Sequence, residues 1–271
     1  MSARQVIGFI GLGEQGAPLA LNLIDAGYAL VVFDLRAEAV GPLIQAGAKL
    51  ASSIKEVGSL VDMVLVCVTD DAQLDAVLEG SGGLLAAMQA GGTVVILSTV
   101  STALVAKVGD QTGKRGLNLL DAPLTGGPVG AREKRVVHFV GGEDDTLATC
   151  RAVLEVSAHK IIHAGPLGAG TRAKLVHQLV LIGNLAVAEG GWSLGRRAGL
   201  DDGVIREVLG GGMAQSIVAE RLPELVPTDH ITALFRKDLS LCQQVADELG
   251  VDIPGLDFAA AYLGETISGS D

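Results

Sequence analysis

Three glycines directly after a short apolar run most constrain how this chain begins to fold. The run is Val6–Ile10, and the glycines follow at positions 11, 13 and 16. In a strand–turn–helix unit, the first glycine permits the turn, the second lets the backbone approach a pyrophosphate, and the third lets the helix pack on the strand. The helix N-terminus then presents free N–H groups to the phosphates. The pattern predicts a dinucleotide site formed by Gly11, Leu12, Gly13, Glu14, Gln15 and Gly16.

An acidic residue follows the second apolar run at the distance this motif requires. Asp34 comes directly after Leu30–Phe33, about 20 residues beyond the glycines. A carboxylate there accepts hydrogen bonds from the ribose hydroxyls and repels a 2′-phosphate, so the sequence favours NAD over NADP. Arg36 softens this preference and keeps NADP as the less favoured cofactor. A glycine-rich turn with an incidental surface acid is the alternative interpretation.

Strand and helix patterns alternate through the first part of the chain. The expected strands cover residues 5–10, 30–33, 63–68, 93–97, 117–121 and 135–140, and the expected helices cover 17–26, 37–46, 73–78 and 102–111. This alternation predicts the α/β class, with a Rossmann-type doubly wound parallel sheet.

Beyond residue 164 the pattern becomes helical. Apolar residues recur at helical spacing from Thr171 to Ala198, and the remainder predicts helices interrupted at Gly210–Gly212, Pro223, Pro227 and Pro254. We therefore expect a dinucleotide-binding Rossmann domain over residues 1–164. An all-α substrate and oligomerisation domain is expected over residues 165–271, and it begins with a long interdomain helix.

A single lysine lies inside this long apolar helix. The segment Gly168–Ala173 leads directly to Lys174. An amine beside a carbon that exchanges a hydride can donate a proton in reduction and accept one in oxidation, provided that partial burial lowers its pKa towards neutrality. The alternative is a lysine whose stem packs on apolar surface while its ammonium group stays in water.

Four segments of the chain resemble the β-hydroxyacid dehydrogenase family, which includes 3-hydroxyisobutyrate, tartronate-semialdehyde and threonate enzymes. They are the glycine segment 11–16 with Leu21-Asn22-Leu23, then Ser98-Thr99-Val100-Ser101, then 121–128, and finally 168–174 with Lys237-Asp238-Leu239. The segments span nearly the whole chain in the family's order. The resemblance implies an NAD(P)-dependent oxidoreductase that acts on the CH–OH group of a small anionic hydroxy acid, with Lys174 as the catalytic lysine.

The resemblance also implies a substrate site. Thr125, Gly126 and Gly127 align with the family's carboxylate-binding segment, where two glycines let N–H groups converge on an anion and the hydroxyl adds a donor. An ordinary turn between a strand and a loop is the alternative interpretation. Gln178 stands where the family commonly has Asn, and it shares a helix face with Lys174. The pattern of Lys174, His177 and Gln178 is most similar to the threonate-dehydrogenase branch. A satisfied interdomain residue is the alternative role for His177.

Further residues are assigned to the cofactor by the same resemblance: Val68, Thr69, Thr99, Phe235 and Lys237. An ordinary β-branched strand end is the alternative interpretation of Thr99.

Bulk composition narrows the classes of partner. The net charge of −11 and pI near 4.9 disfavour nucleic acid and anionic membranes as partners. No apolar run approaches the ~20 residues of a membrane span. Three widely separated cysteines are typical of a reduced, cytoplasmic protein, and the histidines lack metal-ligand spacing, so we expect no metal site. The apolar outer surface of the long helix predicts a homodimer or homotetramer.

Two other functions remain open at this stage. An imine reductase-like NADP enzyme would have a similar architecture, but such enzymes typically lack the lysine, so Lys174 argues against that class. The second alternative is a catalytically idle NAD-binding protein, which need not keep a lysine, a carboxylate loop and a ribose acid together.

Overall fold

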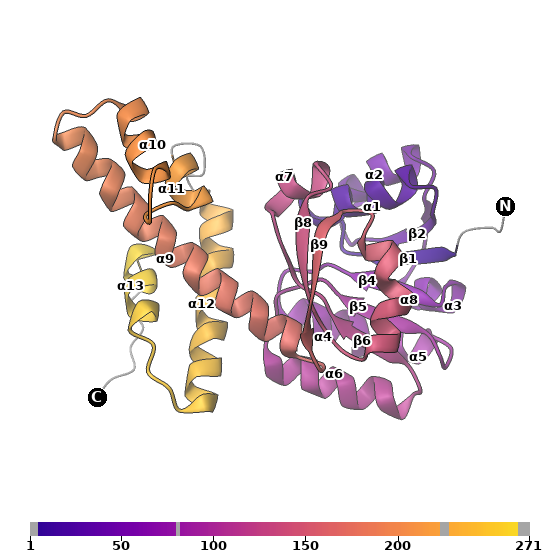
Figure 1. Cartoon of the computed structure of the whole chain (residues 1–271). Helices are drawn as coiled ribbons and strands as arrows, with labels where there is room; N and C mark the ends of the chain where they lie inside the picture. Colours follow the sequence, from indigo (N-terminus) through magenta and orange to yellow (C-terminus); the bar gives the residue numbers. More distant parts are fainter. Residues whose placement is uncertain (1–4, 80–81, 223–227, 265–271) are drawn as a thin grey trace. The chain divides into compact units, whose positions relative to one another are not determined.

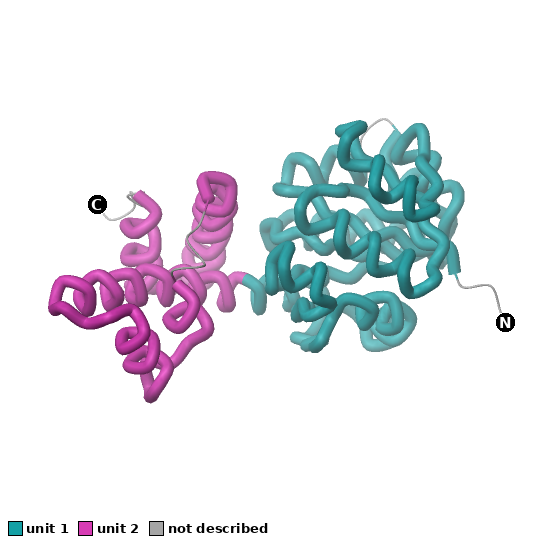
Figure 2. Tube along the Cα trace, turned by 90° about the horizontal axis from the view of Figure 1, so that it is seen from above, with its two compact units in different colours: residues 1–174 teal, residues 175–271 magenta. Residues whose placement is uncertain are grey.

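The computed structural model describes residues 5–79, 82–222 and 228–264, and it divides into two compact units (Figures 1 and 2). The first unit covers Met1–Lys174 and the second covers Leu175–Asp271. Their boundary lies inside the helix α9 (Ala169–Arg197), whereas the sequence expectation placed it at 164/165. The first turn of α9 belongs to the first unit because it packs directly against the ends of the sheet strands.

The described part of the first unit contains a nine-stranded sheet. The strand order is β3-β2-β1-β4-β5-β6-β8-β7, with β9 paired to β8. The strands are β1 (Val6–Ile10), β2 (Ala29–Phe33), β3 (Lys49–Leu50), β4 (Met63–Val66), β5 (Thr93–Ile96), β6 (Asn118–Asp121), β7 (Leu124–Thr125), β8 (Val136–Gly141) and β9 (Ala158–Gly165). Pairing is parallel from β3 through β6, which confirms the Rossmann-type sheet.

One edge of the sheet departs from the parallel expectation. Strand β8 runs antiparallel to β6 through the pair Asp121↔Gly141, and β7 is antiparallel to β8. Between β6 and β8 the chain forms β7 and the short helix α7 (Gly127–Arg132), and β7 pairs back onto β8. Strand β9 then pairs parallel to β8.

Helices cover both faces of the sheet (Figure 1). They are α1 (Gly16–Asp25), α2 (Ala37–Gln45), α3 (Ile54–Leu60), α4 (Asp71–Glu79), α5 (Leu84–Ala87), α6 (Thr102–Lys114), α7 and α8 (Asp144–Leu154). Alternate strand residues supply two separate cores: Phe9 and Leu65 lie in one, and Ile10 and Val66 in the other. Period-2 alternation on a sheet covered on both faces explains why these strands are apolar throughout.

Several elements gave no clear sequence pattern. Helix α8 and the long strand β9 are the largest of these, and every residue of β9 is exposed or half-buried. An edge strand of this kind has no need for apolar alternation. The expected strand 63–68 was too long, since the ladder ends at Val66 and the next two residues enter a loop.

In the described residues of the second unit, all the regular secondary structure is helical. It contains the remainder of α9, then α10 (Asp202–Gly210), α11 (Ile217–Arg221), α12 (Asp229–Leu249) and α13 (Pro254–Tyr262). The expected break at Gly210–Gly212 follows α10, and Pro254 starts α13, a position that proline favours. The expected breaks at Pro223 and Pro227 lie outside the described residues.

The helical unit has two hydrophobic clusters. Leu175 and Ile182 of α9 pack with Leu239 of α12 and neighbouring residues, while Leu185 and Trp192 pack in a separate cluster with α10 and α11. None of the described helices is long and apolar enough for a membrane span.

Candidate functional site

The loop after β1 needs glycine at two positions for the fold itself. Gly11 has φ +89°, and a Cβ atom there would lie 2.3 Å from the Cys67 carbonyl oxygen. A Cβ at Gly16 would lie 2.0 Å from the Gly11 carbonyl oxygen. Both distances are too short for any side chain, because the atoms met are backbone. These two glycines therefore let strand, loop and α1 come into contact.

The middle glycine differs from the other two. A Cβ at Gly13 would meet only the Arg36 guanidinium, at an ordinary 3.6 Å. The fold therefore does not demand glycine there, whereas a ligand placed against the backbone would. Nearby, the buried Gln15 Nε2 donates to no acceptor in the described part of the chain. Open backbone and a buried donor suit the oxygen atoms of a pyrophosphate. Leu12 is buried and Glu14 is exposed in the same loop.

Asp34 fixes the loop to the end of β2. Its Oδ2 accepts from the Leu12 N–H at 2.7 Å, and its Oδ1 accepts from the Arg36 N–H at 2.9 Å. Burial opposes ionisation of Asp34, but hydrogen bonds from the Arg36 and Leu12 backbone and the Arg36 guanidinium outweigh it and hold its pKa below the ordinary value. Asp34 is therefore ionised, as a partner for ribose hydroxyls should be.

The ends of β4 and β5 bring three further predicted residues to the same edge of the sheet. β1, β4 and β5 are parallel neighbours, so their carboxyl ends lie together beside the glycine loop. The Val68 N–H donates to Ser98 Oγ at 2.8 Å, and the Thr69 N–H donates to Gln73 Oε1 at 3.1 Å. Thr99 is half-buried directly after Ser98. Sequence reasoning did not single out Ser98, although its place after an apolar strand offered the signal.

The predicted carboxylate loop has an unusual backbone. Gly126 has φ +119° and Gly127 has φ +60°, so two successive residues adopt conformations that favour glycine. Thr125 ends β7 half-buried, and the short helix α7 starts at Gly127. Successive left-handed residues turn the backbone sharply, which is how consecutive N–H groups come to face one anion.

Lys174 is buried, with only 6% of its surface exposed. It belongs to α9, and Gln178, also buried, follows one turn later on the same face. The exposed residues Val176 and Val180 lie on the opposite face of that helix. Helix α9 therefore has a polar buried face at Lys174 and Gln178 and an apolar exposed face behind it. His177 is half-buried beside them.

Gln178 belongs to a polar cluster in the helical unit. Its Nε2 donates to Asp238 Oδ2 at 2.5 Å, and Asp238 is buried. Lys237 Nζ lies 3.0 Å from Asp238 Oδ1, so the two side chains form an ion pair. The angles of this contact do not meet those of a hydrogen bond. Asp238 was quoted in the sequence only as part of a motif, and its role as the partner of Gln178 was missed. Phe235, predicted to contact the cofactor, packs against both hydrophobic clusters of this unit.

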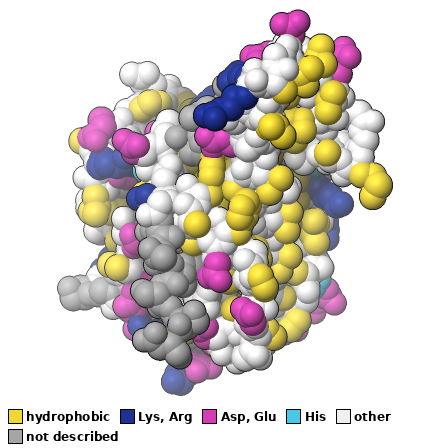
Figure 3. All heavy atoms as spheres, turned by 90° about the vertical axis from the view of Figure 1, so that its left-hand side faces the viewer, with side chains coloured by type: hydrophobic (Ala, Val, Ile, Leu, Met, Phe, Trp, Pro, Cys, Tyr) yellow, Lys and Arg dark blue, Asp and Glu magenta, His cyan; other side chains and the backbone are white. Residues whose placement is uncertain are grey.

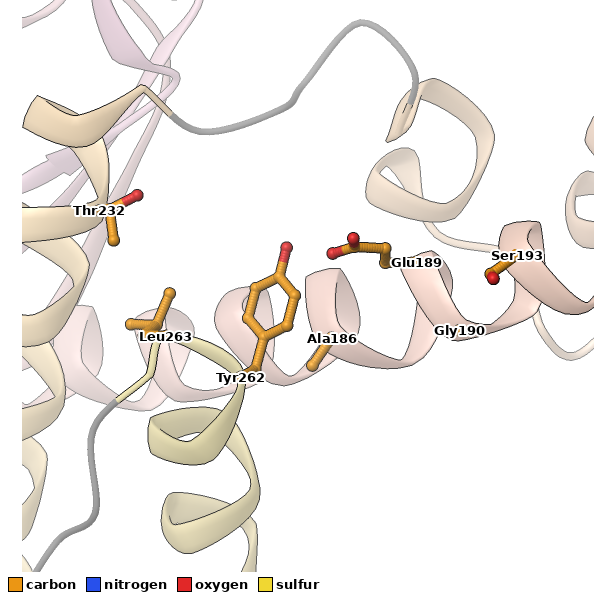
Figure 4. Close-up of a pocket in the computed structure, with 7 residues that line it drawn as sticks. All are labelled: Ala186, Glu189, Gly190, Ser193, Thr232, Tyr262 and Leu263. Carbon is orange, nitrogen blue, oxygen red and sulfur yellow. The ribbon is translucent and has the colours of Figure 1, made fainter.

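The helical unit also contains an open cavity of about 580 Å³ (Figure 4). Glu189 and Tyr262 point toward each other across it. Burial raises the pKa of Tyr262 to about 12, and Glu189 adds to the effect. The residues that line the cavity are Ala186, Glu189, Gly190, Ser193, Thr232, Tyr262 and Leu263, and none was predicted as a site residue. In the described ranges no group of three metal-ligating side chains occurs.

A Rossmann unit whose glycine loop stays open at Gly13, joined to a helix with a buried lysine, defines a nicotinamide-dependent oxidoreductase. Two family models match the chain. Residues 6–165 match the NAD binding domain of 6-phosphogluconate dehydrogenase, and residues 168–270 match the NAD-binding domain of NADP-dependent 3-hydroxyisobutyrate dehydrogenase. The chain belongs to the β-hydroxyacid dehydrogenase family.

Individual relatives agree with this membership. The chain is 35% identical to an NAD-dependent L-serine dehydrogenase of Pseudomonas aeruginosa, over 92% of this chain and 87% of the relative. It is 36% identical to a 3-hydroxyisobutyrate dehydrogenase of the same organism, over 75% and 68%. A solved Mycobacterium tuberculosis 3-hydroxyisobutyrate dehydrogenase with L-serine matches at TM-score 0.85 and 27% identity, over 96% of this chain and 92% of that one.

Proposed function

We propose that this protein is an NAD-dependent dehydrogenase of small hydroxy-carboxylic acids of the 3-hydroxyisobutyrate, glycerate or threonate type. The buried Lys174 carries the proposal. An amine that burial holds beside a substrate oxygen can donate or accept the proton that accompanies hydride transfer. Family membership and the NAD-binding domain agree with the proposal.

Each residue of the proposed active site has a distinct role in catalysis or substrate binding. Bound nicotinamide supplies the hydride acceptor or donor. Lys174 Nζ takes the proton of the substrate hydroxyl during oxidation and returns it during reduction. Thr125, Gly126 and Gly127 hold the substrate carboxylate through the threonine hydroxyl and the turned backbone. Gln178, fixed by Asp238, orients the substrate or the lysine.

The cofactor contacts are proposed along the edge of the sheet. Asp34 accepts from the adenosine ribose, and the backbone at Gly13 together with the Gln15 amide binds the pyrophosphate. The ionised state of Asp34 supports NAD rather than NADP. Val68, Thr69, Thr99, Phe235 and Lys237 remain proposed cofactor contacts, and His177 remains a proposed substrate contact.

Substrate choice within the class depends on residues near Lys174. Gln178 places an amide one methylene further out than the Asn common in the family. A longer amide donor and acceptor suits a polyhydroxylated acid such as threonate. L-serine and 3-hydroxyisobutyrate, which the relatives' names include, belong in the same panel.

We also propose that the protein acts in the cytoplasm as a homodimer or homotetramer assembled through α9. Val176, Val180, Val187 and Leu194 are each more than half exposed, and they recur at heptad-like spacing on one face of the helix. Figure 3, viewed from the side of the helical unit, shows hydrophobic side chains gathered at the surface. A second copy of the same helix would cover such a stripe.

The test is a cofactor and substrate panel on wild type and Lys174→Ala. NAD and NADP are offered with threonate, glycerate, 3-hydroxyisobutyrate and L-serine, and cyclic imines are offered with NADPH. We expect turnover of a hydroxy acid with NAD, and a loss of kcat of about 10²–10⁴-fold in the variant. NAD binding by the variant should stay intact, and Lys55→Ala, an exposed lysine on α3, should behave as wild type.

Two results would overturn the proposal. Wild type that binds NAD but oxidises no acid, with an identical Lys174→Ala variant, would make the lysine structural. Reduction of imines with NADPH in place of acid oxidation would move the protein to the imine reductase class.

A further inference from the structure

Asp121 is a fully buried carboxylate at the junction of the sheet and α9. It is the last residue of β6 and has no exposed surface. Its Oδ1 accepts from the Gly168 N–H at 2.8 Å, and its Oδ2 accepts from the Thr171 N–H at 2.6 Å. Burial raises the pKa of Asp121, and the two backbone N–H groups act against that rise.

This carboxylate replaces the local cap that α9 lacks. The first N–H groups of a helix need acceptors, usually supplied by a Ser, Thr, Asp or Asn at its start. The residues before α9 are Gly165-Pro166-Leu167-Gly168, and none carries a side-chain oxygen. Asp121, from a distant part of the sequence, supplies the acceptor, and a carboxylate also suits the positive end of the helix.

The junction leaves no room for the helix to shift. A Cβ at Gly170 would lie 2.4 Å from the Asp121 carbonyl oxygen and 2.5 Å from the Phe139 carbonyl oxygen. A Cβ at Gly141 would lie 2.4 Å from Asp121 Oδ1. The helix backbone therefore rests directly on the strand ends, with no flexible side chain between them to absorb a displacement.

The same residue adjoins both halves of the proposed chemistry. Asp121 begins the segment that ends in the carboxylate loop Thr125–Gly127, and Thr171 lies within one helical turn of Lys174. We propose that Asp121 is a positioning residue: through Gly168 and Thr171 it fixes the first turn of α9, and Lys174 with it, relative to the carboxylate loop. This inference rests on the proposed function.

The test compares kcat per NAD-binding site in wild type and Asp121→Asn, with sites counted by NAD titration so that unfolded protein does not enter. Asparagine keeps the shape but turns a donor toward one of the two N–H groups. Misplacing a catalytic group by about 1 Å costs on the order of 10²-fold, so we expect kcat per site to fall by about that factor. The dissociation constant of NAD should stay within about twofold of wild type, since β4 and β5 separate β1 and its glycine loop from β6 in the sheet.

A second variant and a control complete the experiment. Asp121→Ser removes the carboxylate and leaves a shorter side chain that cannot accept from both backbone N–H groups, and it adds no atoms to the crowded junction. This second variant should lower kcat per site as Asp121→Asn does. It replaces Asp121→Asn in the comparison if the asparagine variant yields no protein that binds NAD. Thr112→Ala, which removes a buried hydroxyl within α6, should leave kcat per site unchanged.

The outcomes separate this inference from the proposed function. If wild type is active and Lys174→Ala is not, but either junction variant turns over within about twofold of wild type per site, Asp121 is only structural. If wild type itself turns over no hydroxy acid, the proposed function fails first.

Discussion

Gln178 donates its side-chain amide to Asp238 across 2.5 Å, and both side chains are buried. The bond joins α9 to α12 and uses a charged acceptor, so it is among the stronger kinds of hydrogen bond. It also fixes the rotamer of the residue that shares a helix face with Lys174. The contact therefore contributes to the stability of the helical unit as well as to the proposed site.

A double-mutant cycle measures this bond. Gln178→Ala, Asp238→Ala and the double variant should give a coupling energy of about 1.5–3 kcal/mol, typical of a hydrogen bond to a charged group. Urea unfolding followed by tryptophan fluorescence reports the right unit, since Trp192 is the only tryptophan and lies buried there. The exposed pair Gln243 and Asp247 on α12, 2.7 Å apart, is the matched control and should couple by only about 0.2–0.5 kcal/mol. Equal coupling in both pairs would contradict a special role for the buried one.

Asp34→Ser should shift the cofactor preference. The variant loses a charged acceptor for the ribose, so NAD should bind about 10–100-fold more weakly. NADP should bind better than in wild type, because Arg36 is released from its ion pair with Asp34. Fluorescence titration with both cofactors provides the measurement. Glu38→Gln removes a nearby charge from α2 without touching Leu12, and it should leave the NAD to NADP ratio unchanged. An unchanged ratio in Asp34→Ser would remove this residue from the ribose site.

His138 predicts a pH dependence of stability in the first unit. Burial lowers its pKa from 6.5 to about 4, and Nδ1 lies 3.1 Å from the Ala122 carbonyl oxygen. Between these two pH values the unfolded chain binds a proton that the folded chain does not. The free energy of unfolding should therefore decrease as the pH falls through this window, by up to about 3 kcal/mol.

The measurement is urea unfolding by circular dichroism at both ends of that window. His138→Asn keeps a donor for the carbonyl and should flatten the dependence, while the exposed His159→Asn should keep the wild-type slope. Other groups, Asp121 among them, contribute equally to all three proteins and cancel in the comparison. A wild-type slope in His138→Asn would show that this histidine is not responsible.

Charge placed on the exposed stripe of α9 should break the proposed oligomer. Val187→Glu puts a carboxylate in the middle of the apolar face, where burial against a second copy would cost several kcal/mol. Light scattering should show a smaller particle than wild type. Leu60→Glu, an exposed apolar residue on α3, should not change the size. A monomeric wild type would refute the assembly outright.

Local patterns in the sequence were sufficient to predict the Rossmann sheet. Strands such as Met63–Val66 are buried on both faces, so they appear as continuous apolar runs between turn residues. Strand β9 was missed because none of its residues is buried, so it gives no such run. The antiparallel β8 was predicted as a strand, but its direction depends on which strand it pairs with, and local patterns do not show that pairing.

Some residues of the candidate site could also be predicted from the sequence, and others could not. The glycine loop and Asp34 were predictable because a turn, a strand end and a helix start lie within a short stretch. The partners Asp121 and Asp238 were not, because their hydrogen bonds reach to α9 from distant parts of the chain. Long-range pairing of this kind depends on tertiary packing, and a single sequence contains no period or spacing that encodes it.

In the glycine loop, cofactor binding and folding depend on different glycines. Gly11 and Gly16 are confined by the protein's own backbone, whereas the space beside Gly13 is open. Changes at position 13 are thus free to alter occupancy by the cofactor at little cost to folding. Substitutions at Gly11 or Gly16 would destabilise the fold before they changed cofactor binding. Whether by design or by evolution, a change of cofactor is therefore accessible through substitutions at position 13, whereas the fold requires glycine at positions 11 and 16.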